Sequence, residues 1–338
     1  MPTIAIDAMG GDFAPETVVS GVAQVSLTTD IQCILVGNET RIQKILEGLA
    51  YNPENIDIVH ASETIGMAED PKEAVKRKRD ASLLVACRLV QQGKAAAVVT
   101  AGNTGAAVLA CVAHFPLLPG VRKAALASVY PRHVEQPEQD YLALALDVGA
   151  TIRCDAAELV QFALMGSAYA RHVSKVGAPR VGLLNMGREE NKGGEVLVDA
   201  HRRLGAVSGL NFVGNVEGHE LATGRADVVV CEGLLGNVVL KLLEGLAEVV
   251  VDLTAAASRR SWRWRAGLAM LSSGVGRLRE LTDYASYGGA PILGFENILI
   301  KAHGRSTALA MGNAVKVAAK AVRDDVPGEI RAAIERVG

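Results

Sequence analysis

The chain has 338 residues, of which 49% are hydrophobic and 21% are charged, and these ordinary globular values exclude disorder of the whole chain. Its length predicts one large α/β unit over residues 1–338, built as a single body or as two lobes. The formal net charge of −2 excludes a global attraction to nucleic acid or anionic lipid, so any such contact has to be local.

Short apolar runs alternate with helical patterns along the chain. Strands are expected at 3–9, 32–37, 56–61, 95–102, 124–130, 141–149, 180–187, 210–218 and 226–233. Helices are expected at 15–27, from 39 to about 50, and, with a basic face, from about 71 to 92. This alternation predicts a mostly parallel sheet with helices on both faces.

Two stretches depart from this rhythm. Residues 95–121 hold no Asp, Glu, Lys or Arg, yet Asn103, His114 and several glycines fit a strand, a polar loop and a helix better than a membrane span. Residues 235–281 are helical without a strand, and we expect an insertion there that contacts a second subunit, a carrier protein or a membrane.

The cysteines are spread along the chain without any C-x-x-C pair: Cys33, Cys87, Cys111, Cys154 and Cys231. This spacing favours neither a disulfide framework nor a zinc site, and it is typical of a reducing compartment. The first residues reach an acidic side chain at Asp7, which does not fit a signal peptide. We therefore expect a cytoplasmic protein with no metal and no cofactor.

Six expected strand ends are rich in Gly, Asn and small polar residues: 7–12, 100–106, 147–150, 185–194, 214–218 and 232–237. Such residues also form plain turns, but ligands of open parallel sheets bind at the carboxyl ends of strands. A shared polar site is therefore predicted. Its expected ligand-binding residues, with two from a later loop, are Asp7, Gly10, Gly11, Thr104, Gly105, Asn215, Glu217, Glu232, Asn237, Lys241, Gly304 and Ser306.

Common nucleotide and hydrolase motifs are absent: there is no Rossmann G-x-G-x-x-G, P-loop, G-x-S-x-G elbow or H-E-x-x-H. An anion site of another design is indicated by TAGNTGA, residues 100–106. A helix begins there near Asn103 or Thr104, and free N–H groups at a helix start favour an anion.

The segment KAHGRS, residues 301–306, repeats this arrangement before a second helix. His303 beside glycine and arginine is a candidate functional residue, whereas Ser306 or Thr307 would also serve as a simple helix cap. Lys192 lies in an acidic, glycine-rich loop and is either a site residue or an exposed lysine. Lys241 follows Asn237 by one helical turn, so the two face the same way.

Several segments, in this order, resemble the PlsX-type phosphate acyltransferases of bacterial phospholipid synthesis. They are IAIDAMGGDFAPE, VTAGNTGA, LDVGA, VGLLNMGREENKGG, FVGNVEG, DVVVCEGLLGNVVLKLLEG, YGGAPILG and KAHGRS. Together they extend from residue 4 to about 320, and their joint occurrence is far more specific than any one of them.

The resemblance implies reversible transfer of a fatty acyl group from acyl carrier protein to inorganic phosphate. The product, acyl phosphate, would be used by a membrane acyltransferase that acylates glycerol 3-phosphate. The resemblance also implies a homodimer, and a fold similar to the isocitrate/isopropylmalate dehydrogenase and phosphotransacetylase group.

We expect direct transfer without a covalent enzyme intermediate, because phosphate is already an anion and needs positioning more than deprotonation. The thioester oxygen needs preplaced donors as charge develops on it. Asn103, Lys192 and His303 are the expected catalytic residues, with Thr104 and Gly105 also holding phosphate.

Three alternatives stay open at this stage. The first is a short-chain phosphotransacetylase that uses coenzyme A thioesters. The second is a nicotinamide-dependent decarboxylating dehydrogenase, although the arginine and aspartate sets that it needs are missing. The third is a non-catalytic scaffold that recruits carrier protein to membranes.

The segment SRRSWRWRAGLAMLSSG, residues 258–274, holds both tryptophans of the chain. In a helix, an apolar stripe would lie among arginines, which fits a dimer-packing helix or a basic amphipathic surface. Such a surface would contact acidic carrier protein or the inner face of the plasma membrane as a peripheral attachment. The expected contact residues are Arg259, Arg263, Trp264, Arg265, Leu268 and Leu271.

Overall fold

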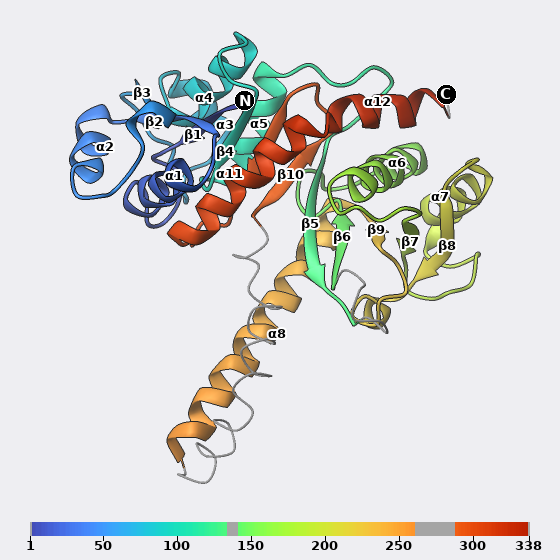
Figure 1. The fold of residues 1–338 in the computed structure, drawn as a ribbon. Coiled ribbons are helices and arrows are strands. Elements are labelled where there is room, and N and C mark those ends of the chain that lie inside the picture. Colours follow the sequence, from blue (N-terminus) through green and yellow to red (C-terminus); the bar gives the residue numbers. More distant parts are fainter. Residues whose placement is uncertain (1, 134–140, 261–287, 337–338) are drawn as a thin grey trace.

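A computed structural model describes residues 2–133, 141–260 and 288–336 (Figure 1). Within these ranges one eleven-stranded sheet has the order β3-β2-β1-β4-β11-β10-β5-β6-β9-β7-β8. The strands are β1 (Thr3–Asp7), β2 (Gln32–Gly37), β3 (Ile56–His60), β4 (Ala97–Thr100), β5 (Ala125–Pro131), β6 (Leu142–Leu146), β7 (Arg180–Leu184), β8 (Asn211–Val216), β9 (Val228–Val230), β10 (Ala290–Leu293) and β11 (Ile298–Lys301).

Helices cover both faces of this sheet. They are α1 (Glu16–Thr28), α2 (Glu39–Leu46), α3 (Pro71–Arg77), α4 (Ser82–Gln91), α5 (Thr104–His114), α6 (Ala156–His172), α7 (Gly194–Ala206), α8 (Gly233–Arg260), α11 (Ala308–Arg323) and α12 (Val326–Glu335). Side chains alternate along a strand, so Ile4 and Ile6 pack in the core with α1 and α11, while Ala5 packs with α4 and α5. The predicted α/β fold with helices on both faces is confirmed.

The sheet consists of two opposed parallel groups. β1, β2, β3, β4 and β11 are mutually parallel, and β10 is antiparallel both to β11 and to β5. β5 therefore runs with the first group, but β6 is antiparallel to β5 and parallel to β9, which is in turn parallel to β7. The carboxyl ends of β6, β7, β8 and β9 consequently point the opposite way to those of β1, β4 and β11.

The single basic helix expected from about 71 to 92 is wrong, because the chain forms α3 and α4 with a break between them. In the break, the Asp80 carboxylate accepts hydrogen bonds from the Ser62 backbone N–H (2.8 Å) and hydroxyl (2.6 Å). The Ser82 N–H donates to the Glu63 carbonyl at 3.1 Å. These long-range bonds replace the helical hydrogen bonds that continuity would have required.

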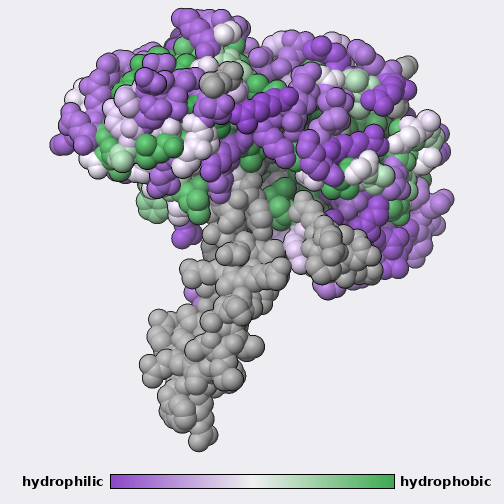
Figure 2. Space-filling model, viewed as in Figure 1, coloured by the Kyte–Doolittle hydropathy of each residue, from purple (hydrophilic) through white to green (hydrophobic). Residues whose placement is uncertain are grey.

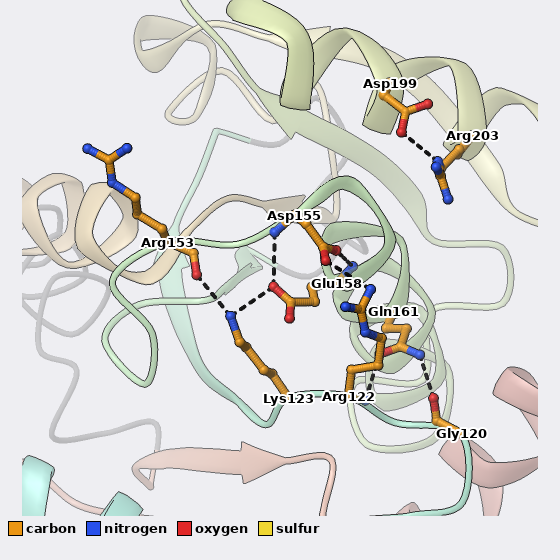
Figure 3. A network of polar contacts seen from close by, with 9 residues as sticks. All are labelled: Gly120, Arg122, Lys123, Arg153, Asp155, Glu158, Gln161, Asp199 and Arg203. Carbon is orange, nitrogen blue, oxygen red and sulfur yellow. Dashed lines mark hydrogen bonds and ion pairs between the residues drawn. The ribbon is translucent and has the colours of Figure 1, made fainter.

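A polar network fixes the segment that leads into β5 against the start of α6 (Figure 3). The Lys123 ammonium donates to the Glu158 carboxylate (3.0 Å) and to the Arg153 carbonyl (3.2 Å), and Arg122 pairs with Asp155 at 2.9 Å. The hydrogen bond to Glu158 is the main reason that the pKa of Lys123 is raised. The start of β5 is thereby anchored to α6.

α8 begins against the sheet and then extends away from the body of the molecule (Figure 1). Leu242, Leu246 and Leu253 on this helix are 54–64% exposed, whereas the visible body surface is mostly hydrophilic (Figure 2). Within the described ranges, no helix is long and apolar enough to cross a membrane. Of the expected contact residues, Arg259 belongs to α8, while Arg263, Trp264, Arg265, Leu268 and Leu271 lie outside the described residues.

At Gly166, α6 packs so closely on the sheet that there is no room for a side chain. A Cβ atom there would lie 2.6 Å from Val228 Cγ1 and 2.9 Å from Leu146 Cδ1. Overpacking costs about 1–3 kcal/mol, which exceeds the ~1 kcal/mol that alanine gains over glycine in a helix. Gly166→Ala should therefore lower the free energy of unfolding in urea. At Gly205, in an exposed part of α7, an added Cβ atom meets nothing within 4 Å, so Gly205→Ala should raise the free energy of unfolding. An equal rise in the free energy of unfolding of both variants would contradict the tight packing at Gly166.

Candidate active site

A cavity of about 300 Å³ lies where the end of β11, the middle of β5 and the start of α8 meet. One part of its wall is polar and includes Thr104, Lys301, His303 and Ser306. The other part is apolar, formed by Leu126, Val129, Val148, Leu240, Ala290, Ala302 and Ala310. The cavity therefore combines hydrogen-bond donors and positive charge with an aliphatic surface.

Lys301 is the buried cation of this cavity, with only 7% of its surface exposed. Its ammonium group donates to the carbonyls of Ala101, at 3.2 Å, and of Ala302. A lysine has three N–H bonds, so among the described residues one donor has no acceptor. Burial lowers the pKa of Lys301 to about 8, although the negative charge of Asp7 opposes this shift.

Asp7 lies behind the cavity wall and is almost completely buried. Its carboxylate accepts hydrogen bonds from the hydroxyls of Ser82 (2.6 Å) and Thr100 (2.7 Å) and from the Met9 N–H (3.3 Å). Burial raises the pKa of Asp7, while these hydrogen bonds and Lys301 lower it. A Cβ atom at Gly10 would lie 2.3 Å from Asp7 Oδ2, so glycine is required for the loop to close over this carboxylate.

The loop after β11 presents two further donors. His303 Nδ1 accepts the Arg305 backbone N–H at 3.2 Å, so the neutral imidazole carries its proton on Nε2. Burial and the nearby Lys241, Lys301 and Arg305 lower the pKa of His303, against the effect of Glu244. Ser306 is only 6% exposed and lines the cavity, and its hydroxyl makes no hydrogen bond within the described part of the chain.

The helix cap after this loop is Thr307 and not Ser306. The Thr307 side chain accepts the Ala310 N–H at 3.3 Å as α11 begins. Ser306 is therefore not used for capping, and its hydroxyl lines the cavity.

α8 supplies the opposite side of the cavity. The Asn237 amide donates to the Val148 carbonyl at 3.0 Å, which ties the start of α8 to the segment after β6. Lys241 lies one turn later and pairs with Glu244 at 2.6 Å. The expectation that Asn237 and Lys241 face the same way is confirmed, since both line the cavity.

The expected site residues fall into two groups. The cavity wall includes Thr104, Asn237, Lys241, His303, Gly304 and Ser306. The others lie outside the wall: Asp7, Gly10, Gly11, Asn103, Gly105, Lys192, Asn215, Glu217 and Glu232. Their functional roles stay predictions, and the structure gives most of them local contacts of their own.

Asn103 acts in the fold as the cap of α5. Its side-chain oxygen accepts the Ala106 N–H at 3.0 Å, and its amide donates to the carbonyls of Met67 (3.0 Å) and Glu69 (3.2 Å). The Lys192 carbonyl accepts the Asn185 amide at 3.1 Å, in the loop after β7. Because β7 runs in the opposite direction to β4 and β11, the loop after β7 leaves the sheet at the opposite end from the loops after β4 and β11.

Sequence reasoning missed Lys301, which stands directly before the AHGRS loop. The available signal was a charged residue ending the apolar run ILIK. A lysine in that position is normally solvent-exposed, so only its burial distinguishes it from an ordinary strand end.

The described residues include no reactive thiol and no cluster of metal-binding side chains. The five cysteines are buried, and burial raises the pKa of each thiol. No described cysteine lines the cavity. Across the described ranges, no group of three His, Cys, Asp or Glu residues is placed to hold a metal ion.

Comparison with known proteins gives close relatives along nearly the whole chain. The profile of a family described as "Fatty acid synthesis protein" matches residues 2–329. The chain is 41% identical over 316 residues to a phosphate acyltransferase from Nitratidesulfovibrio vulgaris, covering 94% of this chain and 90% of the relative. It is 39% identical over 335 residues to a phosphate acyltransferase from Dictyoglomus turgidum, covering 99% and 98%.

Solved structures with similar folds are more distant in sequence. A phosphotransacetylase from Streptococcus pyogenes matches with a TM-score of 0.64 at 17% identity, covering 95% of this chain and 94% of that chain. A 4-hydroxythreonine-4-phosphate dehydrogenase from Klebsiella pneumoniae matches with a TM-score of 0.55 at 14% identity, covering 95% and 100%. These likenesses concern the fold alone.

If Lys301 binds an oxyanion, the affinity for inorganic phosphate should fall as the pH rises above 8. The protonated fraction of a group with a pKa of about 8 drops about tenfold per pH unit above that value. Calorimetry should show binding at least about tenfold weaker at pH 9.5 than at pH 7.5. Lys301→Arg keeps its charge over this range and should flatten the dependence; unchanged wild-type affinity would contradict a role for Lys301.

Proposed function

The chain belongs to the PlsX-type phosphate acyltransferase family, so it is an acyltransferase that moves an acyl group to phosphate, and we propose that acyl carrier protein is the donor of a fatty acyl group. The product is an acyl phosphate for phospholipid synthesis. The site is assigned to this cavity because one N–H of the Lys301 ammonium and the Ser306 hydroxyl make no hydrogen bond within the described residues and lie beside an aliphatic wall.

The proposed reaction is direct. A phosphate oxygen attacks the thioester carbonyl carbon, the C–O bond forms, and the C–S bond breaks with its electron pair leaving on the thiolate. Lys301 and Ser306 hold the phosphate in position, and the His303 Nε2–H donates to the carbonyl oxygen as negative charge develops on it. Thr104 and the Asn103–Gly105 helix start complete the proposed set, while Lys192, which lies outside the cavity wall, stays a prediction.

The buried, protonated cysteines support transfer without an acyl-enzyme. A thiolate is the nucleophilic form of cysteine, and burial disfavours that form at each of the five cysteines. The leaving phosphopantetheine thiolate is a stable anion near neutral pH and needs little acid catalysis. A triad is therefore unnecessary for either half of the reaction.

A second candidate is a short-chain phosphotransacetylase that uses coenzyme A thioesters, which the fold likeness to a phosphotransacetylase favours. That likeness is at 17% identity, whereas relatives at about 40% are phosphate acyltransferases. The fatty acyl reading is therefore the better supported of the two.

The exposed leucines of α8 support contacts beyond a single chain. We propose a homodimer that packs along α8, with the adjoining basic segment of residues 258–278 serving carrier protein or membrane. Peripheral attachment to the inner face of the plasma membrane would deliver acyl phosphate to the membrane acyltransferase that consumes it.

The deciding assay is phosphate-dependent loss of palmitoyl thioester. With palmitoyl carrier protein, the enzyme should release free thiol and acyl phosphate only when phosphate is present. Ser306→Ala should lower kcat/KM for phosphate by about 10- to 100-fold, because one hydrogen bond to an anion is worth roughly 1.5–3 kcal/mol and about 1.4 kcal/mol is a factor of ten. The exposed Ser208→Ala is the matched control.

Three outcomes would count against parts of this proposal. Faster turnover of short coenzyme A thioesters would favour the phosphotransacetylase alternative. An acyl-cysteine trapped in acid would exclude direct transfer. Full activity after replacing both Asn103 and Lys192 would remove these two residues from the mechanism.

The membrane proposal predicts separable effects of the tryptophan segment. Trp264→Glu combined with Leu268→Glu should release the protein from anionic vesicles in a flotation assay, because both changes remove apolar contact and add negative charge. Transfer from soluble palmitoyl carrier protein should survive. Joint loss of vesicle binding and transfer would instead indicate a structural helix or a carrier-protein dock.

A further inference from the structure

A second cavity of about 20 Å³ lies beneath α8, next to the main one. Its wall is formed by side chains of β5, β6, β9 and α8, with Tyr130, Ala145, Val229 and Leu243 among them. None of the described residues in this wall is charged. Apart from the Cys231 thiol and the Tyr130 hydroxyl, which is buried without a partner among the described residues, the wall is aliphatic. The space is therefore suited to a largely apolar group and not to phosphate.

Leu240 is the one described residue that lines both cavities. It is half-buried on α8, one residue before Lys241 of the main cavity and three before Leu243 of the second. The Leu240 side chain consequently forms part of the partition between the polar site and the apolar space.

One face of β5 connects the two spaces. Leu126, Ser128 and Tyr130 point to the same side because alternate residues of a strand share a face. Leu126 and Ser128 line the main cavity, and Tyr130 lines the second. Ala145 pairs with Ser128 across to β6, so the apolar surface continues sideways from the same point.

We propose that the acyl chain of the substrate extends from the main cavity along this face of β5 into the second cavity, with Leu240 as the residue that determines chain length. The proposal rests on the phosphate acyltransferase function proposed above and adds a path for the chain. The carbonyl carbon stays beside Lys301 and Ser306, and the methyl end lies under α8. Movement of Leu240 joins the two spaces for longer chains.

The test compares kcat/KM for palmitoyl and butyryl carrier protein in Leu240 variants. Leu240→Trp should lower the palmitoyl-to-butyryl ratio by about tenfold or more, since one methylene misfit in an apolar pocket already changes selectivity by that order. Leu240→Ala should raise the ratio. Val238→Ala, at an exposed position of the same helix, is the matched control and should leave the ratio unchanged.

Ala145→Val provides a second test from the far side of the path. Ala145 lines the second cavity and not the main one, so the larger side chain narrows the second cavity from β6 and should also lower the ratio. If Leu240→Trp does not fold, as judged by its melting curve, Ala145→Val decides alone. An unchanged ratio in the folded variants, with an active wild type, overturns this inference only. A wild type that consumes no thioester with phosphate overturns the proposed function itself.

Discussion

The ammonium group of Lys301 lies where little water reaches it, and much of the surrounding structure stabilises it there. An isolated buried charge is strongly unfavourable, and the lowered pKa of Lys301 reflects this cost. Two backbone carbonyls and the carboxylate charge of Asp7 offset part of it. Asp7 is in turn held by hydroxyls from α4 and β4, so the ends of β1, β4 and β11 are coupled through one pair of opposite charges.

This coupling fixes the shape of the cavity wall. The loops after β1 and β11 are also joined directly, because the Asp12 N–H donates to the Gly304 carbonyl at 2.8 Å. The remaining ammonium donor of Lys301 and the Ser306 hydroxyl are then held in place at the cavity wall, as the proposed phosphate site requires. Preorganised donors of this kind stabilise charge without reorganisation during the reaction.

The strands reverse direction between β5 and β6, yet the segments after β6 and β9 still reach the cavity through Val148 and Asn237. Six Gly- and Asn-rich strand ends were interpreted as one shared site in a mostly parallel sheet. The β-α rhythm predicts the strands well, since QCILVG corresponds to β2 and TAGNTGA leads into α5 at Thr104. It does not reveal that β10 enters the sheet from late in the chain and that β6 turns back. Thr104, His303 and Asn237 line the cavity, while Lys192 and Glu217, which follow β7 and β8, do not.

Local pattern determined the elements of this protein, because apolar periodicity and helix-start residues act over a few positions. It located the first nine strands but not β10 and β11, and it located the helix start near Asn103, the common face of Asn237 and Lys241, and the motifs that resemble a known family. The tertiary structure decided the rest through contacts between distant segments. The break between α3 and α4 depends on Ser62 and Glu63, and the burial of Lys301 depends on β1 and β4. Whether a charged or apolar residue forms part of a site depends on the residues that pack against it. For Lys301 one of these is Ala101, 200 residues away in the sequence.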